Sequence, residues 1–469
     1  MSLEFKVLSH ACLLIKSDDT SIIIDPWLLG SCYWRSWWNF PKAKFDIQEI
    51  EEVDAVLISH VHWDHWHGPT LRKYFKNKRI IIPDEPGLRS RCDLQQMGFK
   101  THPVKHGKTF KLGSFKITLY QFGLIFTDAA IVIETNGKVI LNANDAKIAG
   151  FPLREILKKH GDIDFAFRSH SSANPRICYE LEGGDYAQYD DPEHYFRSFA
   201  LFMSAVKPKY AIPFASNHCH LHKEVFKYNS YISDPIELEK YIEQANHEYN
   251  WKLKVMMPGS KWTEESGFHL EDPIEFKNKD IALEEYQNEV KDKLEDTYEK
   301  EGKIEIDKLT WNKFNLMTQT PFYRKDLGKF MVSITKPDGS GSSKLIYKNQ
   351  IQDVSFTNKS ESGIPLIIIP AIVFRDSVKK NMFEHAGISK RCRFLASNEK
   401  DMKRLVRIVN HIEKKERLPL ALTTRQLIRF PIAYIRRWRE LFVYLEAFYL
   451  RYLKKLPLYI VEEKILNKT

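Results

Sequence analysis

The sequence contains no apolar run long enough to cross a membrane as a helix. Such a helix needs roughly 20 consecutive apolar residues. The longest candidate among the 469 residues, the segment 364–374, is short and contains Pro365 and Pro370. We therefore expect a protein that is soluble or bound to a membrane only at its surface.

Cysteine pairs are also missing. The six cysteines are scattered without any CxxC spacing, which fits a reducing compartment better than a disulfide framework. Residues 1–6 lead directly into a strand pattern and show no signal peptide. A cytoplasmic protein is therefore expected. The paired cysteines and histidines of a Rieske iron-sulfur site do not occur before residue 58.

Length and charge indicate two domains. The chain exceeds what one hydrophobic core usually organises. Residues 277–308 are rich in Glu, Lys and Asp, which is typical of a charged connecting helix. We predict a catalytic domain over residues 1–270, a charged helical connector over 271–310 and a basic α+β domain over 311–469. The last of these contains most of the net charge of +10, because residues 371–469 hold 23 Lys and Arg against 10 Asp and Glu.

Short apolar runs alternate with helical patterns up to about residue 260. This order favours an α/β fold with two sheets flanked by helices and a site at one rim. The expected strands are residues 4–8, 13–16, 21–25, 55–58, 79–83, 115–120, 130–134, 139–142, 164–168 and 210–214, and the expected helices are 70–76, 86–97 and 192–206. In the C-terminal domain we expect a hairpin of residues 330–334 and 344–347, strands at 354–356 and 366–369, and basic helices to the end.

The strongest chemical signal is the sequence ISHVHWDH at residues 58–65. It follows an apolar strand and supplies four metal-ligand side chains: His60, His62, Asp64 and His65. In an extended chain His60 and His62 share one face and can bind one ion, while Asp64 and His65 can reach a second. Two ions roughly 3.5–4 Å apart can hold the attacking and leaving oxygens of a displacement. The alternative interpretation is an aromatic turn that packs in the core.

These residues resemble the His-x-His-x-Asp-His signature of the metallo-β-lactamase superfamily. The segments 9–15 and 21–28 are similar to the opening strands of its lactonase-like and phospholipase-D-like branch. A closer resemblance, through 58–65, 69–71, 128–134, 139–145 and 213–215, is to the metallo-β-lactamase-like part of the cytidine-monophosphate-N-acetylneuraminic acid hydroxylase family. It covers roughly the first 260 residues and implies an αββα sandwich with a dinuclear metal site.

The resemblance assigns further ligands and also shows departures. Asp145 follows an apolar strand where the superfamily carries its bridging aspartate; the alternative is a capping role. The superfamily histidine expected shortly before it is absent. Asp128 is the nearest candidate, either as a ligand, as a partner of a ligand histidine or as a cap.

The late superfamily histidine is displaced too, because Pro213 occupies its position. Three histidines follow nearby: His218, His220 and His222. In an extended chain all three share a face, and in a helix His218 and His222 do. A surface histidine patch is the alternative. His170, after the strand 164–168, is expected in the active site as a ligand or proton-transfer residue, or else it is an ordinary loop histidine.

The ligand set predicts two divalent metal ions. Carboxylates in place of histidines favour iron or manganese over zinc. Our leading hypothesis is a hydrolase in which a hydroxide on the two metals attacks a phosphodiester, ester or thioester of an anionic small molecule, with Asp64 and His170 as catalytic residues. The second is a dinuclear-iron monooxygenase that takes electrons from a partner protein, and the third is a binding protein without catalysis.

The C-terminal segment 425–455 interleaves aromatic residues with cations at near-helical spacing. Three interpretations remain open. It lies on an anionic membrane surface, it binds a phosphate group, or it packs its aromatic face on its own domain with the cations in water. No motif indicates specific nucleic-acid recognition.

Overall fold

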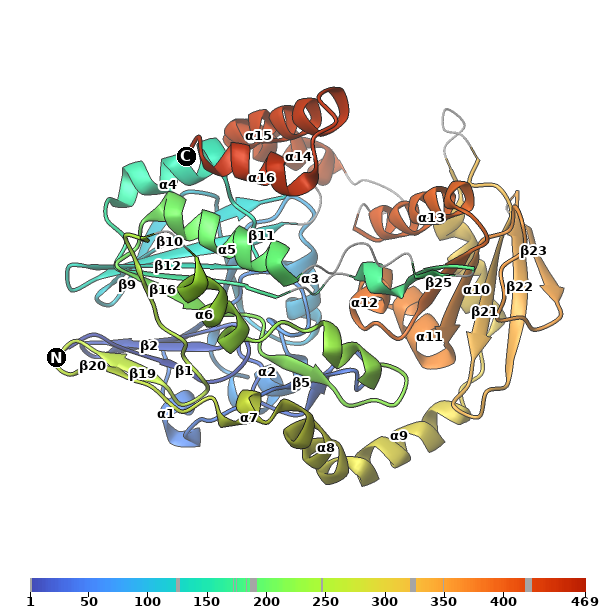
Figure 1. The fold of residues 1–469 in the computed structure, drawn as a ribbon, viewed down its shortest axis with the longest axis horizontal. Helices are drawn as coiled ribbons and strands as arrows, with labels where there is room; N and C mark the ends of the chain where they lie inside the picture. The colour runs from blue at the N-terminus through green and yellow to red at the C-terminus, as the bar shows by residue number, and fades with distance from the viewer. Residues whose placement is uncertain are drawn as a thin grey trace.

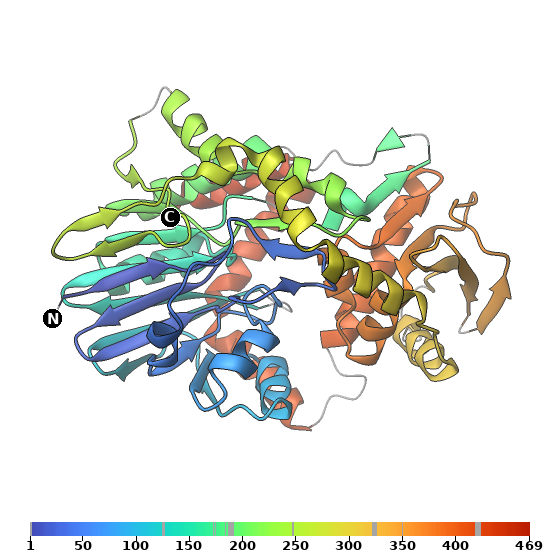
Figure 2. The ribbon, with the colours of Figure 1, turned by 90° about the horizontal axis from the view of Figure 1, so that it is seen from below.

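The computed structural model describes residues 2–123, 127–171, 173, 175–182, 184–185, 192–245, 248–320, 326–348, 350–417 and 424–469. Its N-terminal part consists of two sheets packed face to face between helices (Figure 1, Figure 2). The expected αββα sandwich is therefore confirmed, and so is the α+β region that follows it.

The first sheet has eight strands in the order β20-β19-β1-β2-β3-β6-β7-β8. The strands are β1 (Glu4–Val7), β2 (Leu13–Ser17), β3 (Thr20–Ile24), β6 (Ala55–Leu57), β7 (Arg79–Pro83), β8 (Thr101–Val104), β19 (Lys261–Thr263) and β20 (Gly267–His269). From β3 to β8 they run parallel. In β2, Leu13 and Ile15 face the core between the sheets and Leu14 faces the flanking helices, so the apolar run at the start of this strand is buried on both sides.

The second sheet has seven strands in the order β18-β16-β13-β12-β11-β10-β9. They are β9 (Thr109–Leu112), β10 (Phe115–Phe122), β11 (Asp128–Thr135), β12 (Lys138–Asn144), β13 (Phe165–Arg168), β16 (Tyr210–Pro213) and β18 (Lys252–Leu253). The strands β12, β13, β16 and β18 are parallel. A small third sheet, β17-β5-β4, pairs β4 (Ser31–Cys32) and β5 (Trp37–Asn39) with β17 (His218–His220).

Helices cover the outer faces of the sandwich. The first sheet packs against α1 (Ile47–Glu51), α2 (Gly68–Tyr74) and α3 (Arg89–Gln96) through one apolar cluster. The second packs against α4 (Gly150–His160), α5 (Pro192–Val206) and α6 (Pro235–Gln244) through another. Short 3-10 turns lie at η1 (Pro175–Cys178) and η2 (Phe226–Tyr231). Both sheets meet in a third cluster that includes Phe5, Phe165 and Phe214.

Three helices rather than one occupy the expected connector: α7 (Ile274–Lys277), α8 (Lys279–Glu289) and α9 (Lys291–Gly302). They are not simply solvated. Leu283, Val290 and Leu294 pack in one cluster with Trp38 and Leu221 of the first domain. The connector therefore lies along the sandwich on its way to the C-terminal region, as Figure 2 shows.

The C-terminal sheet has the order β15-β14-β25-β24-β21-β22-β23. Its strands are β21 (Phe330–Thr335), β22 (Gly341–Tyr347), β23 (Gln350–Val354), β24 (Leu366–Pro370) and β25 (Arg393–Ala396), joined by β14 (Tyr179–Leu181) and β15 (Gly184–Asp185). It packs against α10 (Lys308–Thr318), α11 (Ala371–Lys379), α12 (Phe383–Ile388) and α13 (Glu399–Arg417). The expected hairpin is present, whereas the strand expected at 354–356 lies earlier, at β23.

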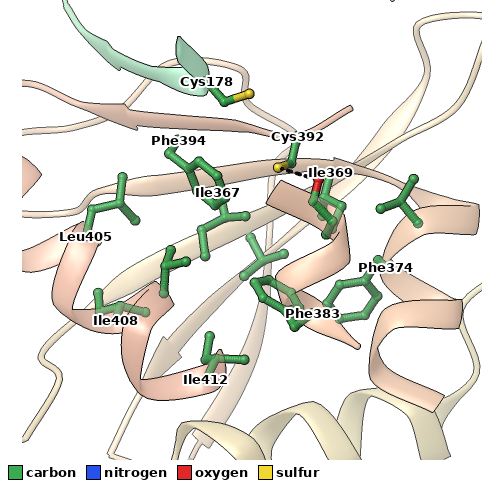
Figure 3. Packing of buried hydrophobic residues seen from close by; sticks show 14 of the residues in the cluster. Cys178, Ile367, Ile369, Phe374, Phe383, Cys392, Phe394, Leu405, Ile408 and Ile412 are labelled. Atoms are coloured by element: carbon green, nitrogen blue, oxygen red, sulfur yellow. Dashed lines mark hydrogen bonds between the residues drawn. The ribbon is translucent and has the colours of Figure 1, made fainter. Parts of the chain in front are cut away.

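Two segments cross the domain boundaries that the sequence suggests. β14 lies within residues 1–270 but pairs with β25 of the C-terminal sheet, and Cys178 packs in that domain's core with Phe394 and Ile367 (Figure 3). In the other direction, α14 (Thr424–Arg436), α15 (Trp438–Phe448), η3 (Tyr449–Leu453) and α16 (Leu458–Leu466) return to the first domain, where α15 contacts α4 and α16 contacts α5. The two domains are therefore interlocked rather than consecutive.

The C-terminal helices bear on the three interpretations of the segment 425–455. Several of their aromatic residues are exposed, among them Trp438, Phe442 and Phe448, whereas Arg437 and Glu440 are buried. The buried pair hydrogen-bonds the backbone of Gly123. Val443 and Leu450 are buried as well, in a cluster with Val461 and Ile465 of α16. None of the helices in the described ranges is both long and apolar enough to cross a membrane.

Candidate metal centre

The candidate site lies where the parallel strands of both sheets end. In neighbouring parallel strands the carboxyl ends meet at one edge, which is where side chains for binding collect. Asp25 follows β3 and His60 follows β6, while Asp145 and His170 follow β12 and β13 on the facing sheet. The sandwich therefore brings together residues that are more than a hundred positions apart.

The backbone at two strand ends is left-handed and turns polar groups inward. Asp25 has φ 46° and Asn144 has φ 44°, a conformation in which Asp and Asn are enriched. The Asn144 amide donates to Asp25 Oδ2 at 2.6 Å. Asp25 also accepts from the Ser59 amide at 2.7 Å, the Ser59 hydroxyl at 2.6 Å and His65 Nδ1 at 2.9 Å. This buried carboxylate thereby fixes the ring of His65.

Within the described residues, two groups of three side chains place potential ligand atoms within 4.8 Å of one another. The first group is His10, Asp64 and His65. His10 Nε2 lies 3.1 Å from Asp64 Oδ2, and His65 Nε2 lies 3.4 Å from the same oxygen. All three side chains are buried. The Tyr33 hydroxyl donates to the other oxygen, Asp64 Oδ1, at 2.5 Å.

The second group is His60, His65 and Asp145. His65 Nε2 lies 3.1 Å from Asp145 Oδ2. The Ser59 hydroxyl lies 2.9 Å from His60 Nδ1 and leaves Nε2 facing the site, 2.9 Å from His62 Nδ1. The two groups meet at His65 and are therefore adjacent. Because His65 Nδ1 is bonded to Asp25, the one remaining nitrogen, Nε2, could ligate only one of two neighbouring metal ions.

The shifted pKa values of Asp64, Asp145 and His65 indicate a negative electrostatic potential at the site. Burial alone would raise the pKa of Asp64, but the charges of His65 and His10 lower it well below its usual value. Burial would also raise the pKa of Asp145, and the hydrogen bond from His65 lowers it. Burial would lower the pKa of His65, yet the charges of Asp64 and Asp25 raise it well above normal. The same negative potential would stabilise a bound cation.

His62 lies at the outer side of this centre, among further carboxylates. Its Nε2 is 3.7 Å from Glu384 Oε1. Burial would lower the pKa of His62, but the hydrogen bond and charge of Glu384, followed by the charge of Asp128, raise it. The negative charge of Asp128, at the start of β11, therefore favours the protonated form of His62. Glu384 comes from α12, so the C-terminal domain contributes to the site.

His170 and His218 lie beside His10 and have ring atoms without partners. Both ring nitrogens of the buried His170, and Nε2 of His218, have no hydrogen-bond partner among the described residues. Burial and the nearby His10 lower the pKa of His170 to about 3. The rings of His10 and His218 are 5.5 Å apart. Unpaired buried imidazoles next to carboxylates are suited to a metal ion, so the donor set fits the expected pair of ions.

His220 and His222 do not join either group. His220 Nδ1 lies 3.3 Å from the Ser36 carbonyl oxygen, and its ring contacts the edge of Trp37. The ring of His222 packs against Tyr298 with centroids 4.8 Å apart. Burial lowers the pKa of both, to about 2 for His222. These two histidines pack around the site rather than in its ligand groups.

Sequence reasoning missed His10, Asp25, Tyr33 and Glu384 as functional residues. His10 follows the expected strand 4–8 and Asp25 ends the expected strand 21–25, so the rule that strand ends collect at one rim could have found them. Tyr33 and Glu384 carry no comparable signal, because their approach depends on the loop after β4 and on the docking of the C-terminal domain.

A cavity of about 1110 Å³ opens beside His62. Its wall includes Tyr33, Trp63, Glu384 and His385 next to the site. Aromatic rings and cations line the rest, from both domains: Trp34, Trp66, Arg35, Arg72, Lys313 and Lys379. Such a lining suits a molecule that has both a flat or apolar part and negative charge.

The sequence model of the beta-lactamase superfamily domain matches residues 4–165. The matched range includes residues 58–65, so the resemblance to that superfamily is confirmed for this part of the chain.

Curated relatives extend this similarity along the chain. A protein of Mycolicibacterium smegmatis described as a Rieske 2Fe-2S iron-sulfur protein is 27% identical over 54% of this chain and 51% of its own length. The cytidine monophosphate-N-acetylneuraminic acid hydroxylase of Gorilla gorilla gorilla is 26% identical over 58% of this chain and 47% of its own length. The chain thus spans about half the length of these relatives. Among solved structures, CmlA, a diiron beta-hydroxylase from Streptomyces venezuelae, is 17% identical with a TM-score of 0.37, covering 56% of this chain and 53% of that chain.

Proposed function

We propose that the protein is a dinuclear metal-dependent hydrolase of an anionic small molecule. The observation that carries this proposal is the pair of adjacent ligand groups that share His65, next to a cavity lined by cations and aromatic rings. A pair of divalent ions held there would lower the pKa of a coordinated water toward about 7 and neutralise charge on the substrate.

The protein's own side chains have distinct roles in this proposal. His60, His65, Asp145, Asp64 and His10 hold the ions. Asp25 and Tyr33 orient two of these side chains. Asp25 accepts a hydrogen bond from His65 Nδ1 at 2.9 Å, and the Tyr33 hydroxyl donates to Asp64 Oδ1 at 2.5 Å. His170 is buried, neutral and near His10, which suits it either to complete the ligand set or to pass a proton to the leaving group.

Arg35 and Arg72 recognise the negative charge of the substrate. Guanidinium groups bind phosphate and carboxylate in two-point contacts, and Trp34, Trp63 and Trp66 offer faces for a flat ring. We expect Arg72→Gln to raise KM about tenfold for a phosphate-bearing substrate while kcat changes little, because Arg72 contacts charge that is present before and during reaction. An unchanged KM would exclude Arg72 from substrate binding.

A second candidate function is hydroxylation by a dinuclear iron site. It is favoured by the carboxylates near His62, Glu384 and Asp128, since oxygen-rich ligand sets suit iron or manganese. It also agrees with the name of the hydroxylase relatives, whose substrate is an anionic nucleotide-sugar. This reaction would consume oxygen and need electrons from a partner protein.

One experiment separates the two. The protein is depleted of metal and reloaded with zinc, manganese or ferrous iron, and each form is assayed for release of nitrophenol from bis(nitrophenyl) phosphate and nitrophenyl esters, and for oxygen uptake with a chemical reductant. Hydrolysis with two bound ions and no oxygen uptake supports the first proposal. Oxygen uptake by the iron form alone supports the second, and fewer than two ions per chain in every form contradicts both.

A further inference from the structure

The helix α15 buries an ion pair as well as apolar side chains: Val443 packs in a cluster with Leu450 of η3 and with Val461 and Ile465 of α16. Arg437 and Glu440 are almost fully buried, and Arg437 Nε donates to Glu440 Oε2 at 2.8 Å. Glu440 accepts from the Gly123 amide at 2.6 Å and from the Tyr444 hydroxyl at 2.9 Å. Removing one member of a buried ion pair is costly, so this network fixes the rotation of the helices about their axes.

The opposite side of these helices is apolar and faces outward. We call it the outer face and define it by six residues: Ile435, Trp438, Phe442, Leu445, Phe448 and Tyr452. They are spaced three or four positions apart, so they form one continuous stripe along the helices. Ile435 is 70% exposed, Leu445 is 65% exposed and Tyr452 is 66% exposed. Phe151 of α4 extends the stripe through its ring contact with Phe442.

A stripe of this kind is unusual on a protein surface that faces water only. Large exposed apolar patches mark binding surfaces. Single exposed apolar residues elsewhere, such as Ile281 and Leu309, need no such explanation because they are isolated. The outer face therefore has an apolar partner.

The charge around the outer face indicates which partner it is. Residues 424–469 contain ten Lys and Arg against four Glu, and one of the four, Glu440, is buried in its ion pair. Arg436, Arg451, Lys454 and Lys455 are exposed next to the stripe. Aromatic and aliphatic side chains flanked by exposed cations are typical of helices that lie in the headgroup region of an anionic bilayer.

We propose that the outer face binds the surface of a membrane that contains anionic lipids. A second copy of the chain fits less well, because a two-fold contact through this stripe would bring the same cations together. Figure 1 shows α14, α15 and α16 at one edge of the molecule. Among the residues that the structure describes, none of these helices lines the cavity next to Glu384, so membrane binding and substrate entry use different surfaces.

The test is flotation of the full-length protein with phosphatidylcholine vesicles, with and without phosphatidylserine. We expect binding to the phosphatidylserine vesicles to be at least about tenfold stronger, because each exposed cation near the surface adds to the attraction. The double variant Leu445→Ser and Phe448→Ser should lose at least about tenfold of that binding, and the double variant Lys454→Gln and Lys455→Gln should lose the preference for phosphatidylserine.

The matched control is the double variant Ile281→Ser and Leu309→Ser, which removes exposed apolar groups of the same kind from α8 and α10. It should bind vesicles as the unaltered protein does, and all variants should keep the same melting temperature. Equal binding to both vesicle types, or none to either, overturns the proposal. So does a dimer in light scattering that the Leu445 and Phe448 substitutions dissociate, because a second copy then covers the outer face.

Discussion

Two histidine clusters of similar density lie in this sequence, at residues 60–65 and 218–222, and the structure uses them differently. In the first, carboxylates surround the imidazoles, and the pKa values of His62 and His65 are raised by Glu384, Asp64 and Asp25. In the second, burial lowers the pKa values of all three histidines, and nearby cations lower them further: Lys390 acts on His218 and His220, and Arg391 acts on His222. Close histidine spacing alone therefore does not decide which imidazoles face the candidate site: His218 lies beside His10, whereas His222 lies near Glu301, whose carboxylate is already paired with Arg391.

The largest expected effect comes from removing a carboxylate of the first cluster. Asp64→Asn should lower turnover and metal content at least about a hundredfold, since even partners of metal ligands contribute 10–100-fold. Asp64 Oδ2 lies close to Nε2 of both His10 and His65, so the variant would remove a negative charge beside both imidazoles. Elemental analysis and turnover measure the effect, and circular dichroism checks the fold. Full activity in this variant would exclude Asp64 from the site.

The next effect tests the carboxylate behind the ligands. Asp25 accepts four hydrogen bonds, and in Asp25→Asn an amide group would point at some of the same donors. We expect about 10–100-fold weaker metal binding, with His65 less well oriented. Titration of the metal-free protein with zinc measures the affinity. An unchanged zinc affinity would show that the ring of His65 is oriented without the hydrogen bond to Asp25.

The sequence predicts the first cluster well because its residues are local. His60, His62, Asp64 and His65 follow a single strand, so the turn after β6 gathers them without help from the rest of the chain. Asp145 was found through resemblance and through its place after a strand. His10 and Glu384 were not predicted in this way. His10 reaches the site through the packing of the two sheets and Glu384 through the docking of α12, and no local sequence pattern encodes either.

The same limit explains the C-terminal helices. Their hydrophobic pattern predicts helices correctly, and a helix ordinarily packs its apolar side inward. Here Arg437 and Glu440 are buried beside Val443, and the partner of this ion pair is the backbone of Gly123, more than 300 positions earlier. A contact so distant in sequence cannot be read from helical spacing.

A third test uses the pH dependence of stability to distinguish the second histidine cluster from the first. The folded-state pKa of His222 is about 2, below its ordinary value of about 6.5. The unfolded chain therefore binds a proton that the folded chain does not, and stability is complete above pH 6.5 and lost as the pH falls from there toward 2. By pH 5 the loss is up to about 2 kcal/mol for one such histidine.

The variant His222→Gln should remove this part of the loss. Urea unfolding of the metal-free protein at pH 7.5 and pH 5 measures it, with the unaltered protein as reference. If the difference in unfolding free energy between the two pH values is the same for both proteins, His222 is protonated in the folded state and the contrast between the clusters does not hold for this residue.

The smallest expected effect is on catalysis in that same variant. At pH 7.5 the His222 ring is neutral, packs against Tyr298 and lies outside both ligand groups. We expect His222→Gln to keep two bound metal ions and to change turnover by less than about threefold, because substitutions away from a site act mainly on stability. The same metal and turnover assays as for Asp64→Asn measure this. A loss as large as that of Asp64→Asn would place the second cluster in the catalytic centre, and histidine spacing would then be a sufficient signal.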